Sequence, residues 1–255
     1  MPEGHITHRN ARRLAAALTG RALTVEAPEP RLAAQRIPER LEGRRVTAVD
    51  AAGKHLLVRF DDGAVLHSHL GMVGSWRVVA AADDLPRRGL WLVLRTEDHA
   101  VAQYRGPHLR LVAPGAPLPA VAVLGPDLLS PDVDPAEATA AALARVDPAR
   151  AVGEAILDQR VVAGVGNVYR CETLFLCGID PWRTVGSLTA EERRLVGSTA
   201  ARLLAQAARD TGAARPAMWV YRRAGRPCRR CGTPIRSRGQ GDANRTAYWC
   251  PACQS

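Results

Sequence analysis

Lysine is almost missing from this chain of 255 residues. Thirty-four of its 35 basic residues are arginine, and Lys54 is the single exception. An arginine guanidinium stays protonated in a protein, whereas a lysine amine is a compact charge whose pKa can be tuned for proton transfer or phosphate contact. Lys54 is therefore either a functional amine or a leftover surface residue.

Long apolar segments are also missing. No run of about 18 apolar residues is free of charge, and the N-terminus is polar and starts a helical pattern. This excludes a membrane-spanning helix and a secretory signal, so we expect a cytoplasmic protein without a membrane partner. Internal repeats and low-complexity tracts are absent as well, and an apolar content of 47% is ordinary for a globular chain long enough for two domains.

Positive charge is plentiful and concentrated near the C-terminus. The net charge is +10. Residues 215–255 contain a single acidic residue, Asp242, against nine arginines: Arg215, Arg222, Arg223, Arg226, Arg229, Arg230, Arg236, Arg238 and Arg245. Such a distribution favours a polyanionic partner, and a solvated basic face is the alternative interpretation.

Four of the six cysteines form two Cys-x-x-Cys pairs within this basic segment. The pairs are Cys228/Cys231 and Cys250/Cys253, with 18 residues between them. This spacing is typical of a tetrahedral zinc site with four thiolates, whereas two disulfides would fit the short gaps poorly. We expect one structural Zn²⁺ and no organic cofactor. Cys171 and Cys177 lie in a helical stretch and are interpreted as core residues.

The pattern of apolar residues divides the chain into a strand-rich half and a helical half. A helix is predicted over Glu3 to Leu18, followed by short alternating runs that predict an antiparallel sandwich or barrel. These runs are Val46–Val49, His55–Phe60, Ala64–His69, Ser75–Val79, Leu90–Thr96, Val101–Tyr104 and Leu109–Val112. A proline-rich linker at Pro114–Pro119 precedes helices predicted at Pro135–Val146, Ala151–Leu157, Asn167–Cys177 and Thr189–Asp210, the last with a Thr189/Glu192 capping box.

Glycines interrupt the helical half between Leu157 and Tyr169. Gly164 and Gly166 predict a turn, and Asn167 is expected to cap the next helix. Backbone N–H groups at such a helix start can bind phosphate. A tight packing turn is the alternative interpretation of this motif alone.

The N-terminus offers a candidate reactive amine. Methionine before proline is normally removed, and Pro2 would then present a secondary amine that can condense with an aldehyde to an iminium. An α-amino group titrates near roughly 8, so part of it is nucleophilic at neutral pH. Glu3 follows directly and could act as an acid. The alternative is that Pro2 and Glu3 only begin a helix.

Several motifs in chain order together resemble the formamidopyrimidine-DNA glycosylase and endonuclease VIII family. They are Met1-Pro-Glu-Gly, Gly53-Lys54, His69-Leu-Gly-Met-Val-Gly, Leu124-Gly-Pro-Asp, Asp158-Gln followed by Val-Ala-Gly-Val-Gly-Asn-Val-Tyr169, and the segment from Pro227-Cys to Cys253. The ending Tyr-Trp-Cys-Pro-x-Cys looks closer to the endonuclease VIII branch, as in the bacterial endonuclease VIII 2 type.

The resemblance implies an α+β multidomain fold. It has an N-terminal antiparallel β-sandwich with an N-terminal helix, a helical helix-two-turn-helix domain and a C-terminal four-cysteine zinc-finger β-hairpin. The expected boundaries are 1–113 for the catalytic sandwich, 114–127 for the linker, 128–213 for the helix-two-turn-helix domain and 214–255 for the zinc finger.

The resemblance also implies a bifunctional base-excision repair enzyme, a DNA glycosylase and AP lyase. Pro2 would attack C1′ of a damaged nucleotide while Glu3 donates a proton to the sugar, and β,δ-elimination would then cut the strand. Lys54 and Arg245 would assist catalysis, Asn167 and Arg245 would contact DNA, and Met72 would be the wedge that replaces the extruded base. A buried core methionine is the alternative for Met72.

The expected partner is double-stranded DNA with oxidised bases or abasic sites, bound by a monomer at the bacterial nucleoid. About a dozen residues separate Asp210 from Tyr221, too few for the segment with which formamidopyrimidine glycosylases cover 8-oxoguanine. Oxidised pyrimidines such as thymine glycol and 5-hydroxycytosine are therefore the expected substrates. His5 replaces a frequent proline, and no Arg-x-Phe pair occurs around residues 104–108.

Two other functions remain open from the sequence. One is a catalytically inactive DNA-binding protein of the same fold, against which Pro2, Glu3, Lys54 and Arg245 argue. The other is a glycosylase that prefers 8-oxoguanine or formamidopyrimidine. A zinc-ribbon transcription factor would leave the strand-rich half unexplained.

Overall fold

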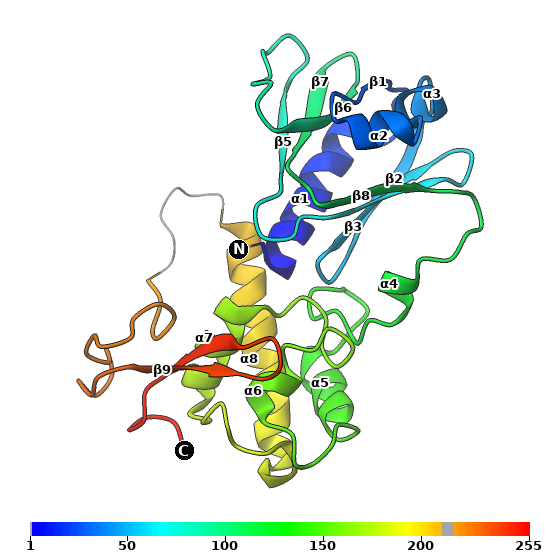
Figure 1. The fold of residues 1–255 in the computed structure, drawn as a ribbon. Helices are drawn as coiled ribbons and strands as arrows, with labels where there is room; N and C mark the ends of the chain where they lie inside the picture. Colours follow the sequence, from blue (N-terminus) through cyan, green and yellow to red (C-terminus); the bar gives the residue numbers. More distant parts are fainter. Residues whose placement is uncertain (1, 211–216) are drawn as a thin grey trace. The chain divides into compact units, whose positions relative to one another are not determined.

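The computed structural model describes residues 2–210 and 217–255 and divides the chain into two compact units, Met1–Ala122 and Val123–Ser255 (Figure 1). We call them unit 1 and unit 2. Among the described residues, no helix is long and apolar enough to cross a membrane. The predicted four-part division, with its linker at 114–127, stays a prediction.

Unit 1 begins with helix α1 (Gly4–Leu18), which buries one face in the core of the unit. The buried face includes Ala11, Leu14 and Leu18, as the helical period predicts. Thr19 ends the helix in an extended conformation, and Gly20 follows with a φ of 78°. A positive φ favours glycine, so the chain can turn at Gly20 directly after the helix.

Two antiparallel four-stranded sheets share the core with α1. One sheet has the order β2-β3-β4-β8 and the other β1-β6-β7-β5. The strands are β1 (Thr24–Glu26), β2 (Val46–Ala52), β3 (His55–Phe60), β4 (Val65–His69), β5 (Ser75–Ala80), β6 (Leu90–Arg95), β7 (His99–Tyr104) and β8 (His108–Val112). The predicted antiparallel sandwich is therefore confirmed. Strand β1 and the short helices α2 (Pro30–Ala34) and α3 (Ile37–Leu41) were not predicted.

Unit 2 is helical, as expected, with a separate apolar core. Its helices are α5 (Pro135–Leu143), α6 (Val152–Ala155), α7 (Asn167–Cys177), the 3-10 helix η1 (Val185–Ser187) and α8 (Ala190–Arg209), and α4 (Pro119–Ala122) ends unit 1. The Thr189/Glu192 capping box of α8 is present. Strands β9 (Arg236–Gln240) and β10 (Arg245–Trp249) form an antiparallel hairpin.

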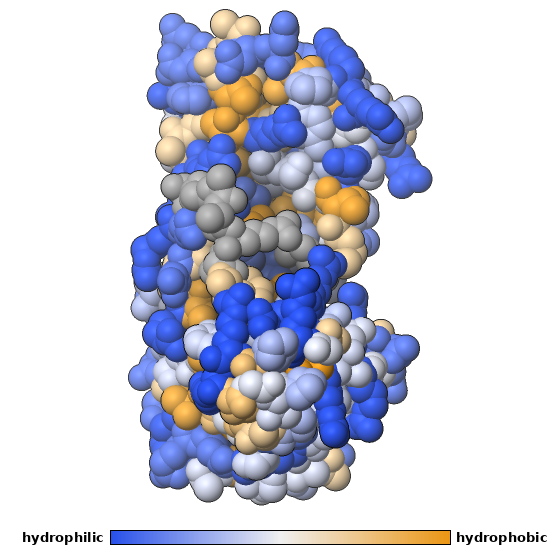
Figure 2. Space-filling view, turned by 90° about the vertical axis from the view of Figure 1, so that its left-hand side faces the viewer, coloured by the Kyte–Doolittle hydropathy of each residue, from blue (hydrophilic) through white to orange (hydrophobic). Residues whose placement is uncertain are grey.

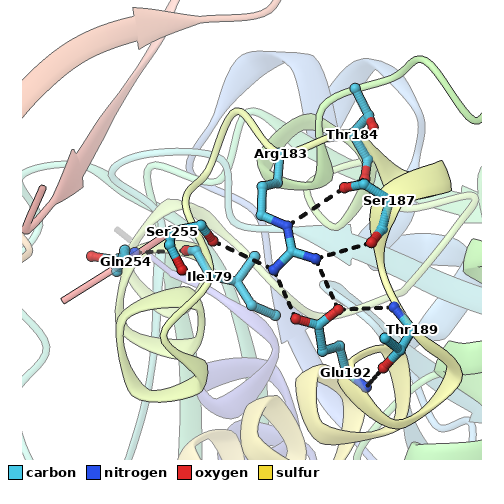
Figure 3. Close-up of polar contacts among 8 residues, drawn as sticks. All are labelled: Ile179, Arg183, Thr184, Ser187, Thr189, Glu192, Gln254 and Ser255. Carbon is cyan, nitrogen blue, oxygen red and sulfur yellow. Dashed lines mark hydrogen bonds and ion pairs between the residues drawn. The ribbon is translucent and has the colours of Figure 1, made fainter. Parts of the chain in front are cut away.

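Arg183 ties three parts of unit 2 together (Figure 3). Its guanidinium binds both carboxylate oxygens of Glu192 at 2.7 and 2.9 Å. It also donates to the carbonyl oxygens of Ser187 at 3.0 Å and Ser255 at 3.4 Å. Because Glu192 also caps α8 through Thr189, the segment after the last cysteine is fastened to the start of the longest helix.

Candidate catalytic and nucleic-acid-binding sites

The predicted reactive residues Pro2 and Glu3 lie at the start of α1. Pro2 is half-buried, and Glu3 has an exposed fraction of 0%. The carbonyl oxygen of Glu3 accepts the N–H groups of Ile6 at 2.9 Å and Thr7 at 3.4 Å, which fixes the first turn. Burial and the charge of Arg9 lower the pKa of His5 to about 4, so this ring is neutral at pH 7. A candidate amine is thus followed directly by a buried carboxyl group.

Lys54 occupies a two-residue turn between β2 and β3. Ala52 pairs with His55 across the turn, and Gly53 takes a φ of 57°. A first turn position with positive φ is a place for glycine in tight hairpins. Burial is the main cause that lowers the pKa of His69, and Lys54 contributes to that shift through its charge. The charge of the single lysine therefore acts on His69, the last residue of β4.

The loop between β4 and β5 presents the predicted wedge. Met72 is 58% exposed, and its neighbour Val73 is exposed as well. The alternative of a core methionine is therefore wrong. A Cβ on Gly71 would come within 2.6 Å of Cγ of Pro107, and a Cβ on Gly74 within 2.5 Å of the Leu70 carbonyl oxygen. Both glycines are needed for this tight loop, which pushes two apolar side chains outward.

The turn between α6 and α7 is organised by Gln159. Its amide nitrogen donates to the carbonyl oxygens of Leu157 at 2.8 Å and Val165 at 2.9 Å, and its oxygen accepts the N–H of Gly164 at 3.1 Å. Gly164 has a φ of 94°. The predicted turn is therefore present.

Asn167 does not cap α7, contrary to the expectation from the sequence. Gly166 is the N-cap, and Asn167 is the first residue within the helix. Its side-chain nitrogen instead donates to the carbonyl oxygen of Thr246 on β10 at 2.9 Å. Asparagine is a good cap only when it precedes the first helical residue, and here a glycine takes that place. Asn167 thus holds the zinc hairpin.

Arg170, one turn further along α7, also grips the hairpin. It has an exposed fraction of 0%. Its guanidinium donates to Oε1 of Gln240 at 2.9 Å and to the carbonyl oxygen of Arg245 at 3.1 Å. The main chain of the predicted DNA-binding residue Arg245 is therefore fixed from α7, while its side chain is exposed. Asn167 and Arg170 thus bind the main chain of two neighbouring residues at the start of β10, Thr246 and Arg245.

The four predicted zinc ligands come together in unit 2. The sulfur atoms of Cys228, Cys231, Cys250 and Cys253 lie within 4.8 Å of one another. Zinc–sulfur bonds of about 2.3 Å in a tetrahedron place sulfur atoms about 3.8 Å apart, so the cluster fits one Zn²⁺. The N–H of Arg230 donates to Sγ of Cys228 at 3.4 Å, as suits a thiolate. Four thiolates leave no open position, and the ion is structural.

Glu172 anchors the segment that leads into the zinc cluster. This buried carboxylate accepts the N–H groups of Trp219 at 2.8 Å, Val220 at 3.0 Å and Tyr221 at 2.8 Å. Sequence reasoning missed both Glu172 and Arg170. Charged residues on a helix are usually exposed, and the only available signal was their position just after the glycine turn.

The exposed side chains around the zinc cluster are strongly basic. Figure 2 shows hydrophilic residues gathered on the side where the hairpin lies in Figure 1. The exposed arginines of this segment are Arg222, Arg226, Arg229, Arg230, Arg236, Arg238 and Arg245. Arg238 lies over the ring of Trp182 at 4.2 Å, which combines a fixed charge with an aromatic face. Such a surface suits a phosphate backbone. Arg215 lies outside the described residues. The same holds for residues 211–216 of the short segment between Asp210 and Tyr221, whose length was the reason to expect pyrimidine lesions.

Three family profiles match successive parts of the chain. They are the "Formamidopyrimidine-DNA glycosylase N-terminal domain" over residues 1–111, the "Formamidopyrimidine-DNA glycosylase H2TH domain" over 124–216, and the "Zinc finger found in FPG and IleRS" over 225–255. These matches cover far more than half of the chain.

Curated relatives agree with the profiles. The chain is 44% identical to a probable endonuclease 8 2 of Streptomyces coelicolor, with 100% of this chain and 94% of the relative covered. It is 40% identical to the DNA-(apurinic or apyrimidinic site) lyase Nei2 of Mycolicibacterium smegmatis, with 100% and 99% covered.

The fold is shared with solved structures of the Lactococcus lactis formamidopyrimidine-DNA glycosylase. Its complex with abasic-site DNA has a TM-score of 0.84 at 24% identity, and both chains are covered completely. Its complex with DNA containing an oxidised pyrimidine gives the same values. The chain therefore belongs to the formamidopyrimidine-DNA glycosylase and endonuclease VIII family, on the endonuclease VIII side, and is a DNA glycosylase and AP lyase of base-excision repair with one structural zinc ion.

Proposed function

We propose that this enzyme removes oxidised pyrimidines from duplex DNA through a Schiff base at Pro2 and cuts the strand by β,δ-elimination. The observation that carries the proposal is the position of Pro2 directly before Glu3, whose carboxyl group is completely buried at a helix start. A nucleophile and a proton donor are needed at the same sugar carbon, and these adjacent residues supply both.

The reaction begins when the free amine of mature Pro2 attacks C1′ of the damaged nucleotide. The base leaves and takes up a proton, the Pro2 nitrogen releases one, Glu3 gives a proton to the ring oxygen, and the opened sugar remains attached as an iminium. Loss of the C2′ proton then expels the 3′ phosphate, and a second elimination expels the 5′ phosphate. Hydrolysis frees Pro2 from the remaining sugar fragment and leaves a gap of one nucleotide.

The other predicted residues bind and shape the DNA. Lys54 holds a phosphate near the reacting sugar, and Asn167 and Arg245 contact the backbone from unit 2. Met72 fills the gap that the extruded base leaves, which its exposure on a tight loop supports. Base extrusion costs a few kcal/mol, and an inserted apolar side chain offsets part of that loss of stacking.

Pyrimidine lesions such as thymine glycol and 5-hydroxycytosine are the proposed substrates, and the likeness to relatives named endonuclease 8 supports this choice. Relatives named endonuclease 8 2 are 44% and 40% identical, while a formamidopyrimidine-DNA glycosylase of Methylococcus capsulatus is 37% identical over 85% of this chain. These bacterial relatives also support action in the cytoplasm, where the chromosome lies.

Borohydride trapping tests the proposal directly. The untagged protein is incubated with duplexes that carry thymine glycol, 8-oxoguanine or an abasic site, and borohydride reduces any iminium to a stable amine. We expect a covalent complex on thymine glycol and on the abasic site, with less on 8-oxoguanine. The same protein with a retained N-terminal tag should give none.

One matched variant tests the proton donor. Glu3→Gln keeps the shape of the side chain but has no acidic proton, so it should bind the abasic duplex while trapping more slowly. Full trapping by the tagged protein would exclude Pro2 as the nucleophile. Stronger trapping on 8-oxoguanine than on thymine glycol would instead assign the enzyme to purine lesions.

A further inference from the structure

Four histidines lie on one face of the β2-β3-β4-β8 sheet, although they are far apart in the sequence. His55 on β3 is directly opposite His69 on β4, and His69 is opposite His108 on β8. His67 lies two residues before His69 and shares its face, because side chains alternate along a strand. We call these four residues the histidine row.

The rings of the row contact one another. Nδ1 of His55 and Nε2 of His67 are 2.8 Å apart, so one ring donates a hydrogen bond to the other. Ring centroids are 4.9 Å apart for His55 and His69 and 5.7 Å apart for His69 and His108. The N–H of Gly71 donates to Nδ1 of His69 at 3.2 Å, which leaves the proton of neutral His69 on Nε2.

The row continues a sheet face whose other end is covered. At that end Leu57, Val65 and Val112 pack against Leu118 and Val121. Within the row, two of the four rings are half-buried, one is buried and that of the β8 histidine is exposed. Packing explains the apolar end of this face, but it does not explain four polar rings in contact at the accessible end.

Cationic groups surround the row. Lys54 directly precedes it, and Arg110 on β8 lies opposite His67. The carboxylate that the described strands place on this face is that of Asp50 on β2, and it is bound to Nε of Arg59 at 2.6 Å. Like charges in one place oppose protonation of the rings, and they attract an anion.

His55 and His67 are neutral at pH 7 in the free protein. Burial is the largest cause that lowers the pKa of His55 and His67 to about 4. The neighbouring histidines with Lys54 lower the pKa of His55 further, and Arg110 does so for His67. A phosphate beside the rings would act in the opposite direction and favour a charged ring.

A transition metal is the other ligand that clustered histidines suggest. In the described parts of both units, the cysteine cluster is the one group of three or more His, Cys, Asp or Glu residues whose ligand atoms are near enough to share an ion. A cation at the row would also be repelled by Lys54 and Arg110. The geometry and the charges therefore favour an anion.

We propose that the His55–His67 pair binds a backbone phosphate of the DNA next to the one held by Lys54, and takes up one proton as it binds; this rests on the proposed function for the identity of the polyanion. In the bound state His55 carries the charge. Its Nδ1–H donates to Nε2 of His67, and its Nε2–H donates to a phosphate oxygen. His67 stays neutral with its proton on Nδ1 and acts as a positioning residue. One proton passes from solvent to the pair, and no covalent bond changes.

The pH dependence of DNA affinity tests this pair. The dissociation constant of the full-length zinc-loaded protein is measured by fluorescence anisotropy on a duplex with a tetrahydrofuran abasic analogue, from pH 8 to pH 5.5 at constant salt. Phosphodiesters do not titrate in this range. One linked proton predicts that the affinity of the wild type rises with falling pH, by about tenfold per pH unit at most.

Two variants and a matched control isolate the pair. His55→Gln cannot carry a charge, and His67→Leu removes the acceptor for His55 while filling a similar buried volume. Both should flatten the pH dependence. At pH 6, His55→Gln should also lower the slope of log affinity against log salt by about 0.9, the value for one phosphate contact. The control is His99→Gln on β7, which belongs to the other sheet and should keep the wild-type slopes.

The outcomes separate this inference from the proposed function. Wild-type pH and salt slopes in His55→Gln would overturn the phosphate-binding pair, whatever the result with His67→Leu. Failure of borohydride trapping at pH 7.5 in the wild type, with the pH-dependent binding intact, would instead overturn the chemistry at Pro2 and leave the pair standing.

Discussion

The histidine row of unit 1 and the arginine-rich zinc hairpin of unit 2 hold positive charge in different ways. The row lies on a sheet supported by a large apolar core, and its His55 and His67 rings are neutral at pH 7. The hairpin carries arginines that stay charged at any working pH, and the apolar cluster beneath it is small and includes two of the zinc ligands.

The difference shows what each unit depends on. A large core lets unit 1 bury ionisable rings and keep them uncharged until an anion arrives. The hairpin segment cannot bury enough apolar surface alone, so the metal fixes the backbone that presents the arginines. The histidine row therefore becomes charged only when an anion binds. The arginines of the hairpin are always charged, but they are held in position only when zinc is bound.

Loss of a zinc ligand should produce the largest contrast between the regions. Cys250→Ser should release zinc and unfold the hairpin, because structural zinc contributes roughly 10–16 kcal/mol in small zinc domains. Hydrogen exchange should become fast in β9 and β10 and stay slow in β3 and β4, while metal analysis reports the loss of zinc. Cys177 lies outside the cluster, so the control variant Cys177→Ser should keep the metal. Full zinc content in Cys250→Ser would contradict the four-thiolate assignment.

Removal of one hairpin charge should have a large effect on activity with no effect on the metal. Arg245→Ala should slow strand cleavage about tenfold to a hundredfold, since a hydrogen bond to a charged group contributes about 1.5–3 kcal/mol. Arg31→Ala on α2 removes the same charge elsewhere and serves as the control. Normal single-turnover cleavage by Arg245→Ala would show that this side chain does not act on DNA.

Weakening the attachment of the hairpin should have a moderate effect on its stability. Glu172→Gln replaces a carboxylate that accepts three backbone N–H groups, so the segment at Trp219 should lose about 1–3 kcal/mol of local stability. Hydrogen exchange of residues 217–235 measures this loss. Glu191→Gln, exposed at the start of α8, provides the matched control. Unchanged exchange in Glu172→Gln would mean that the hairpin is held by zinc alone.

Acid should reduce the stability of unit 1 through its neutral histidines. The pKa values of His5, His55 and His67 are lowered to about 4 in the folded protein from an ordinary value of 6.5. Between these values the unfolded chain binds more protons, so stability falls as pH decreases from about 6.5 to 4. Hydrogen exchange of β3 and β4 between pH 7 and 5, corrected for intrinsic rates, should show this loss. A variant with His55→Gln and His67→Leu should show a smaller loss, and an equal loss would contradict the neutral state of the row.

Local patterns were sufficient where neighbours in the sequence decide the structure. Strand β3 and helix α7 have the predicted bounds, because a turn at Gly63, with a φ of 82°, follows the strand and Gly166 and Gly178 flank the helix. The capping box of α8 and the cysteine cluster are likewise set by short, specific spacings.

Residues whose role depends on distant partners could not be found in this way. Arg170 and Glu172 read as ordinary polar positions on a helix, and their burial results from the hairpin and the segment before it. The histidine row spans three strands, so it becomes visible only once the strand register is known. Asparagine is a common N-cap residue, so Asn167 was expected to cap α7. The N-cap is Gly166, one residue earlier, and the Asn167 side chain binds the hairpin instead.

The identity of the trapped residue tests the central claim most directly. Lys54 is the one lysine of the chain, so a reduced sugar adduct has two candidate sites, the N-terminal amine and the side chain of Lys54. Mass spectrometry of the digested, borohydride-trapped complex distinguishes them. The account predicts the adduct on the peptide that begins at Pro2, with an unmodified Lys54 peptide. An adduct on Lys54 would contradict it, because the lysine would then be the nucleophile and not the phosphate contact.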